Sequence, residues 1–195
     1  MTTIYLLRHG DYQNPKKLTP FRLPGFPLSS QGKKQASQIA KLLKTKNIDH
    51  IYSSPILRTR QTANIVAKVL NLKPNFSTLL SETDSPLQGT PKKHLKLLTW
   101  SEIFTHKDHL QKGGETLDSV ALRTSKIVKQ VLKAHSGKTI LLVSHGDTCM
   151  TMIYQQVDHD ANQYLKQSRP NIPLTGLVKF QFKNQKLINF TQLNY

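Results

Sequence analysis

Two histidines occupy the same local setting in the sequence, at points where a short apolar run ends. His9 follows one such run and is preceded by Arg8, and His145 follows another and is followed by Gly146. A glycine lets the backbone turn sharply, while an arginine supplies a planar cation that fits the oxygens of an anion. A lone histidine is usually structural, but His-Gly at the ends of two apolar runs suggests a shared catalytic site.

Arg58 adds a further cation to this pattern, because it follows a third apolar run at residues 51–53. The guanidinium groups of Arg8 and Arg58 can each clamp phosphoryl oxygens with two parallel hydrogen bonds. One imidazole can attack phosphorus while the other, when protonated, neutralises charge on the phosphoryl oxygens. The set of two histidines and two arginines therefore indicates phosphate chemistry.

The spacing of apolar residues predicts the elements that must position these side chains. Ser30 is expected to cap the first helix, and residues 78–80 are interpreted as the end of a strand. The predicted strands are 3–7, 51–53 and 139–144, the predicted helices are 31–46, 57–71 and 117–132, and residues 176–182 and 187–193 are predicted to form a hairpin.

Alternating strands and helices predict an α/β fold, and the 195 residues fit one domain, 1–195. We expect a three-layer sandwich in which a mostly parallel central sheet is flanked by helices, with the C-terminal β-hairpin at the sheet edge. Ligands of such sheets bind beyond the carboxyl ends of the strands. His9, Arg58 and His145 are therefore expected to converge on one crevice.

Six sequence segments, in a fixed order, carry a resemblance to a known family. The chain resembles the histidine phosphatase superfamily, which shares the fold of cofactor-dependent phosphoglycerate mutase. The resemblance covers residues 4 to about 150, and an ordered set of six motifs does not arise by chance. The matching segments are LLRHGD (6–11), PLSSQGKKQA (27–36), SSPILRTRQTA (53–63), LLSE (79–82), GGET (113–116) and LVSHGD (142–147).

The resemblance implies a two-step reaction. His9 would be the nucleophile that forms a phosphohistidine, and Glu82 would protonate the leaving oxygen and then activate water. The family's usual Gly-x-Trp-Glu-Gly after this Glu is missing, so Asp84 is a second candidate for the proton donor. Since the cationic pocket supplies the electrostatic stabilisation, we expect no metal ion and no cofactor.

The resemblance also implies a phosphate pocket. Arg8, Arg58 and His145 match its positions, so His145 is expected to act in catalysis and the arginines in substrate binding, together with Gly146. Asn14 is a further substrate-binding candidate, although it lies one position earlier than the family's Asn.

Residues 81–113 are polar and match no family motif, so we expect a variable insertion on the substrate side. Three lysines within it, Lys92, Lys93 and Lys96, could select an anionic tail of the substrate. The phosphorylated small-molecule substrate itself is left open.

Other conspicuous residues receive structural interpretations. Cys149 is expected to be buried rather than reactive, and as the only cysteine it forms no disulfide within the chain. The spacing of His94, His106 and His109 fits no common metal site, so they are expected on the surface. The GGET segment lacks the Lys-Ser/Thr of a phosphate-binding loop and is expected to start the long helix.

The formal net charge is +17, which would attract anions. No run of five or six like charges occurs, and few aromatic residues lie among the basic ones, so nucleic acid is not expected as a partner. The sequence shows no signal peptide or membrane span, and a soluble cytoplasmic protein is expected. The oligomeric state stays open.

The predicted function is a metal-independent, histidine acid-type phosphatase that hydrolyses phosphomonoesters through a phosphohistidine on His9. One alternative is phosphoglycerate mutase-type phosphoryl transfer, although the chain is short for that branch and lacks its Glu-Arg-His-Tyr-Gly segment. The other alternative is a non-catalytic protein on the same fold that binds anions or nucleic acid.

Overall fold

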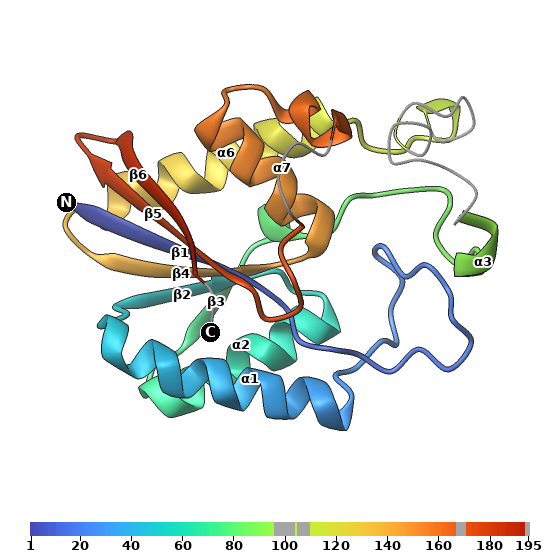
Figure 1. Ribbon diagram of the computed structural model, residues 1–195, viewed down its shortest axis with the longest axis horizontal. Helices are drawn as coiled ribbons and strands as arrows, with labels where there is room; N and C mark the ends of the chain where they lie inside the picture. Colours follow the sequence, from blue (N-terminus) through green and yellow to red (C-terminus); the bar gives the residue numbers. More distant parts are fainter. Residues whose placement is uncertain (96–103, 105–109, 167–170, 194–195) are drawn as a thin grey trace.

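A six-stranded sheet forms the middle layer of the computed structural model, which describes residues 1–95, 104, 110–166 and 171–193 (Figure 1). The strand order is β3-β2-β4-β1-β5-β6. The four strands β1 to β4 are parallel, whereas β5 and β6 are antiparallel and form the edge hairpin. The strands are β1 (Thr2–Arg8), β2 (His50–Ser53), β3 (Pro74–Phe76), β4 (Thr139–Ser144), β5 (Leu177–Lys183) and β6 (Lys186–Leu193).

Helices cover both faces of this sheet, so the predicted three-layer α/β sandwich with a C-terminal hairpin is confirmed. In Figure 1 α1 and α2 lie below the sheet, and α6 and α7 lie above it. None of the described helices is long and apolar enough to cross a membrane. The helices are α1 (Ser30–Leu43), α2 (Leu57–Leu70), α3 (Lys92–Leu95), α6 (Leu117–Ala134) and α7 (Gly146–Val157), with 3-10 turns at Lys44–Lys46, Thr78–Leu80 and Ala161–Lys166.

The core has two parts because side chains of a strand alternate between the faces of the sheet. Ile4 and Leu6 of β1 pack in the cluster that contains buried residues of α6 and α7. Tyr5 and Leu7 pack in the cluster that contains buried residues of α1 and α2. All four of these side chains are buried. The alternation holds β1 rigidly between the helical layers, and with it the residues that follow β1.

Two local predictions were wrong. The N-cap of α1 is Ser29, not Ser30, because the Ser29 hydroxyl accepts a hydrogen bond from the Gly32 N–H. Residues 78–80 form a 3-10 turn rather than a strand end. The Ser77 hydroxyl caps this turn by accepting from Leu79 N, and the edge strand β3 precedes it at Pro74–Phe76. In both places the side-chain cap decided the backbone conformation.

Two loops extend beyond the carboxyl ends of the parallel strands, on the right of Figure 1. Residues 9–29 connect β1 to α1, and the segment that follows Leu80 leads to α3. Backbone hydrogen bonds join the two loops, from Lys92 N to Lys17 O at 2.8 Å and from Thr19 N to Thr90 O at 2.9 Å. The two hydrogen-bonded loops thus line one side of the crevice.

Candidate active site

The sheet order brings the two histidines together. β1 and β4 are paired neighbours, so His9 and His145, which follow them directly, leave the sheet at the same edge. Their ring centroids lie 5.2 Å apart with the rings nearly perpendicular. The predicted convergence of His9, Arg58 and His145 is therefore found in the structure, since Arg58 also contacts His9.

His9 presents an unprotonated ring nitrogen. Its Nδ1 lies 2.8 Å from the Gly10 carbonyl oxygen, which can only accept, so Nδ1 carries the proton. Its Nε2 accepts a hydrogen bond from Arg58 Nε at 3.2 Å. Burial, helped by the charges of Arg58 and Arg8, holds the pKa of His9 well below its usual range. The imidazole is therefore neutral near pH 7, with a lone pair on Nε2.

Each of the two arginines is held by a backbone carbonyl from a different loop. Arg58 is 1% exposed, and its Nη2 donates to Phe21 O at 2.8 Å. Arg8 Nη1 donates to Ile172 O at 2.7 Å. These bonds fix the planes of both guanidinium groups and occupy only part of their donors.

His145 is oriented by Ser54, a residue that the sequence analysis did not select. His145 Nε2 lies 2.9 Å from the Ser54 hydroxyl oxygen, and both side chains are fully buried. Burial and the charge of Arg58 hold the pKa of His145 well below its usual range, so the ring is neutral in the free protein. We had expected one protonated imidazole. If Ser54 donates to Nε2, the proton of His145 lies on Nδ1 and can be donated to a phosphoryl oxygen.

Three nitrogen atoms beside His9 lack partners. They are Arg8 Nε, Arg58 Nη1 and His145 Nδ1, and no other buried side-chain nitrogen among the described residues is without a hydrogen bond. Buried donors are nearly always paired in folded proteins, and each unpaired one costs about 1–3 kcal/mol. Such a group of donors is ready to bind the oxygens of a phosphoryl group.

Gly146 lets one of these arginines reach the site. A Cβ atom at this position would lie 3.0 Å from Arg8 Nη2 and 3.1 Å from its Cζ. A side chain there would crowd the guanidinium group, which would have to shift by a few tenths of an ångström. Gly146 thus makes room for Arg8 at the N-terminus of α7, and its role in substrate binding stays a prediction.

Of the two candidate acids, Glu82 is better placed. It is 7% exposed, and its Oε1 accepts hydrogen bonds from Thr83 N and from the backbone and hydroxyl of Thr148, in the first turn of α7. Asp84 instead forms an ion pair at 3.0 Å with Arg22, and its side chain is 44% exposed. The geometry therefore favours Glu82.

Glu115, in the GGET segment, holds this acidic loop in place. Its carboxylate pairs with Arg22 at 2.7 Å and with Arg123 at 2.8 Å, and it accepts a hydrogen bond from Asp84 N at 3.0 Å. Thr116 caps α6 through its hydroxyl, as expected for a helix start. The segment thus anchors the loop of Glu82 to the long helix.

Asp147 is a buried carboxyl group that the sequence analysis also did not select. The Tyr164 hydroxyl donates to its Oδ1 at 2.9 Å. Burial, together with the charge of Glu82, raises the pKa of Asp147 to about 7. Its position directly after His145-Gly146 was the available signal. Near neutral pH this group can hold a proton close to Glu82.

Asp147→Asn is expected to change how the stability of the protein depends on pH. Because the pKa is about 7 in the folded chain and 3.8 without the fold, the folded state binds more protons in that interval. The free energy of unfolding of the wild type should therefore fall, relative to the variant, as the pH rises from 4 to 7, by roughly 1 kcal/mol per pH unit at most. The effects of the buried histidines cancel because both proteins contain them. Urea unfolding at several pH values measures the difference.

The control is Asp158→Asn, which removes an exposed carboxylate at the end of the same helix. Its unfolding free energy, measured over the same interval, is the reference for loss of a solvent-exposed carboxylate. If the Asp147→Asn curve runs parallel to this reference, Asp147 is already ionised in the folded protein throughout this pH range.

The remaining candidates from the sequence are Asn14, the buried cysteine, and the histidines and lysine of the polar segment. Asn14 lines the crevice, but its amide group bonds the backbone of Leu18 at both ends, at 2.7 and 2.9 Å, so it holds a turn in this structure. Cys149 is buried as expected, and His94 is exposed. No group of three or more metal-ligating side chains occurs among the described residues. Lys96, His106 and His109 lie outside the described part of the chain.

Comparisons with known proteins agree with this geometry. The "Probable phosphoglycerate mutase GpmB" of Citrobacter koseri is 32% identical in an alignment of 157 residues. The alignment covers 75% of this chain and 70% of that protein. Bacillus stearothermophilus YhfR has the same fold, with a TM-score of 0.82 and 24% identity over 96% of this chain and 95% of that one. Phosphoserine phosphatase from Entamoeba histolytica aligns with a TM-score of 0.79 and 21% identity, covering 97% and 96% of the two chains.

The family model described as "Histidine phosphatase superfamily (branch 1)" matches residues 4–193, well beyond the segments that carried the resemblance. The match includes His9, Arg58, Glu82 and His145, which the structure brings to one edge of the sheet. This chain therefore belongs to branch 1 of the histidine phosphatase superfamily.

Proposed function

We propose that this protein is a phosphatase that hydrolyses phosphomonoesters through a phosphohistidine on His9. The observation that carries the proposal is the group of unpartnered nitrogen atoms of Arg8, Arg58 and His145, next to an imidazole whose unprotonated Nε2 accepts a hydrogen bond only from Arg58. Preorganised donors of this kind stabilise charge on a transferring phosphoryl group.

In the first step Nε2 of His9 attacks phosphorus, a P–N bond forms and the P–O bond to the alcohol breaks. This step requires Glu82 to carry a proton when the substrate is bound; Glu82 gives this proton to the leaving oxygen, and the alcohol departs. Arg8, Arg58 and the Nδ1–H of His145 donate hydrogen bonds to the phosphoryl oxygens and stabilise their negative charge during the transfer. Arg58 Nε must release His9 as the phosphoryl group arrives, since it donates to the attacking nitrogen in the free protein.

In the second step the Glu82 carboxylate removes a proton from water as the water oxygen attacks phosphorus. The P–N bond breaks, its electron pair returns to Nε2, and inorganic phosphate is released with Glu82 protonated again. The same carboxyl group thus acts as acid and then as base. The cationic donors supply the charge that a metal ion supplies in other phosphatases, so activity is expected to survive EDTA.

A mutase is the second candidate, because relatives such as the Citrobacter koseri protein are named phosphoglycerate mutases. A mutase returns the phosphoryl group to an alcohol, whereas a phosphatase passes it to water. The two activities share the phosphohistidine and differ only in what accepts its phosphoryl group. Both activities must therefore be measured on one preparation.

The test follows release of inorganic phosphate from p-nitrophenyl phosphate in excess EDTA, and interconversion of 3- and 2-phosphoglycerate with a bisphosphoglycerate primer. We expect phosphate release and no interconversion. Interconversion faster than phosphate release would identify a mutase. Absence of both activities, with no labelling of a histidine by a labelled phosphoryl donor, would favour the non-catalytic alternative.

A further inference from the structure

A cavity of about 980 Å³ opens beside the nucleophile, and its lining is strongly cationic. Arg8 forms one side of it, and four lysines from two loops contribute to the rest. Lys16 and Lys17 come from the loop after β1, and Lys92 and Lys93 come from α3. Arg8 also belongs to the group of donors described above, so the cavity lies next to the place where the phosphoryl group would bind.

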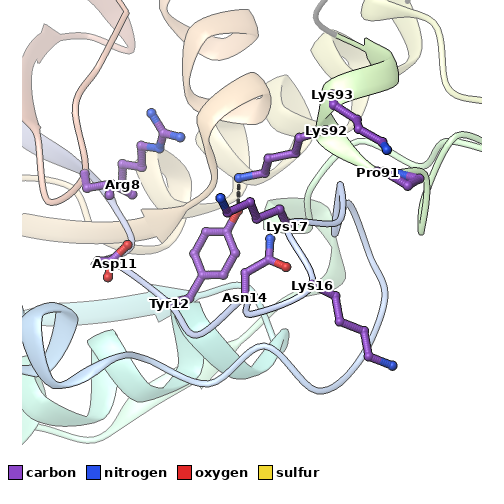
Figure 2. Close-up of a pocket in the computed structure, with 10 residues that line it drawn as sticks. Arg8, Asp11, Tyr12, Asn14, Lys16, Lys17, Pro91, Lys92 and Lys93 are labelled. Atoms are coloured by element: carbon purple, nitrogen blue, oxygen red, sulfur yellow. Dashed lines mark hydrogen bonds between the residues drawn. The ribbon is translucent and has the colours of Figure 1, made fainter.

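Two of the four lysines, both exposed to solvent, are directed towards the middle of this cavity. Figure 2 shows the side chains of Lys17 and Lys92 directed towards the Tyr12 hydroxyl, whereas Lys16 points away. Lys92 Nζ donates to the Tyr12 hydroxyl at 3.4 Å and lies 5.6 Å from the centroid of its ring. The centroid of the His9 ring lies 5.5 Å from the same Tyr12 ring. The Tyr12 ring therefore lies between His9 and these two lysines, Lys17 and Lys92, which we call the inner lysines.

The backbone holds these two lysines in register. Lys92 N donates to Lys17 O at 2.8 Å, and the neighbouring residues Leu18 and Pro91 form an isolated β-bridge. The turn before them is pinned by the amide of Asn14, whose two ends bond Leu18. Binding an anion between the loops would thus require little ordering of the backbone, which lowers the entropic cost of binding.

The charges of the lysines are not balanced within the cavity. Its lining contains one carboxylate, Asp11, which accepts a hydrogen bond from the Ser29 hydroxyl at the start of α1. None of the ion pairs among the described residues involves Lys17 or Lys92. The phosphoryl group that His9 attacks already has Arg8, Arg58 and His145, so the lysines serve a different anionic group.

We propose that the substrate is a compact phosphomonoester with a second anionic group, a phosphate or a carboxylate, which Lys17 and Lys92 bind across the Tyr12 ring from His9. This inference rests on the proposed phosphatase function and narrows its substrate class. Lys17 and Lys92 are specificity-determining residues that contact the distal part of the substrate and take no part in the chemical steps.

The test uses substrates that differ only in the second anion. Glycerol 3-phosphate is compared with 3-phosphoglycerate for a carboxylate, and fructose 6-phosphate with fructose 1,6-bisphosphate for a phosphate. We expect kcat/KM to be at least about ten-fold higher for one of the two doubly anionic members, because a hydrogen bond to a charged group contributes that much. Fructose 1,6-bisphosphate has two phosphates that can be attacked, which alone would raise kcat/KM about two-fold. The expected ten-fold difference is larger than this.

The variant is the double substitution Lys17→Gln and Lys92→Gln. It should abolish the preference while kcat/KM for p-nitrophenyl phosphate stays within about two-fold of the wild type, since this substrate has no second anion. The control with the same change of net charge is Lys126→Gln with Lys129→Gln, two exposed residues of α6 outside the cavity lining. This control should keep the preference, because only local contacts are expected to matter.

Equal kcat/KM for both members of each pair would overturn the inference, while turnover of p-nitrophenyl phosphate would leave the proposed function standing. A preference that persists in the Lys17/Lys92 variant, or that disappears in the α6 control as well, would also overturn it. If no substrate is turned over, the proposed function fails. Calorimetric binding of the same pairs to His9→Ala protein then decides the inference separately, since tighter binding of the doubly anionic members must still depend on Lys17 and Lys92.

Discussion

Replacing His9 by alanine is expected to reduce phosphate release from p-nitrophenyl phosphate by at least about 10³-fold. The substitution removes Nε2, the atom that would form the bond to phosphorus. The donors of Arg8, Arg58 and His145 remain, so the variant should still bind phosphate while it no longer turns substrate over. Initial rates in excess EDTA, with circular dichroism to verify the fold, give the result.

The matched control is His50→Ala, at the amino end of β2 and thus at the opposite edge of the sheet. His50 stacks on His135 with ring centroids 3.8 Å apart, so this variant also loses a partly buried imidazole. It should keep its activity. Rapid acid quenching of the wild type during turnover should reveal a phosphohistidine that His9→Ala lacks. Equal activity in His9→Ala and wild type would assign the reaction to another site or to a contaminant.

Glu82→Gln is expected to produce a loss that depends on the leaving group. General-acid catalysis contributes about 10²- to 10⁴-fold, and its share grows when the departing oxygen is a poor leaving group. For glycerol 3-phosphate, kcat/KM should therefore fall by at least about 10²-fold. For p-nitrophenyl phosphate it should fall by less than about ten-fold, since p-nitrophenolate leaves without a proton. The parameter kcat/KM is the appropriate one, because it reports steps up to loss of the alcohol and not the hydrolysis that follows.

Asp84→Asn serves as the comparison for the proton donor. Asp84 is half-exposed and paired with Arg22, so we expect its replacement to affect both substrates equally and by a small factor. A loss confined to the alkyl phosphate in Asp84→Asn, and absent in Glu82→Gln, would assign the acid to Asp84. Loss in neither variant would point to Asp147, whose pKa of about 7 allows it to carry a proton at neutral pH.

The elements that position the site were largely predictable from local patterns. The long helix Leu117–Ala134 and the buried strand Thr139–Ser144 have unambiguous periodicity, and the structure has them where the sequence predicts them. The errors lie in short segments. At Ser29 and at residues 78–80 one side-chain hydrogen bond selected between conformations of similar intrinsic preference, which periodicity does not register.

Within the site, the sequence pointed to residues with conspicuous neighbours and overlooked those that act through distant contacts. His9, Arg58 and His145 stand in recognisable motifs. Ser54 and Asp147 lie in two of the same matching segments, but neither was selected, because their contacts depend on partners that lie 91 residues and 17 residues away along the chain. Lys17 was overlooked for the same reason, since its proximity to Lys92 arises from hydrogen bonds between two loops that are distant in the sequence.

The sequence by itself determined the family, the α/β architecture and the candidates for the nucleophile and for phosphate binding, because each of these is encoded by neighbouring residues. Only the tertiary structure decided the protonation state of the histidines, the preference for Glu82 over Asp84 and the direction of the inner lysines. These properties depend on burial and on charges brought together by sheet order and loop contacts. A linear pattern names the groups that can react, but desolvation and distance, which set their pKa values and partners, exist only in the folded chain.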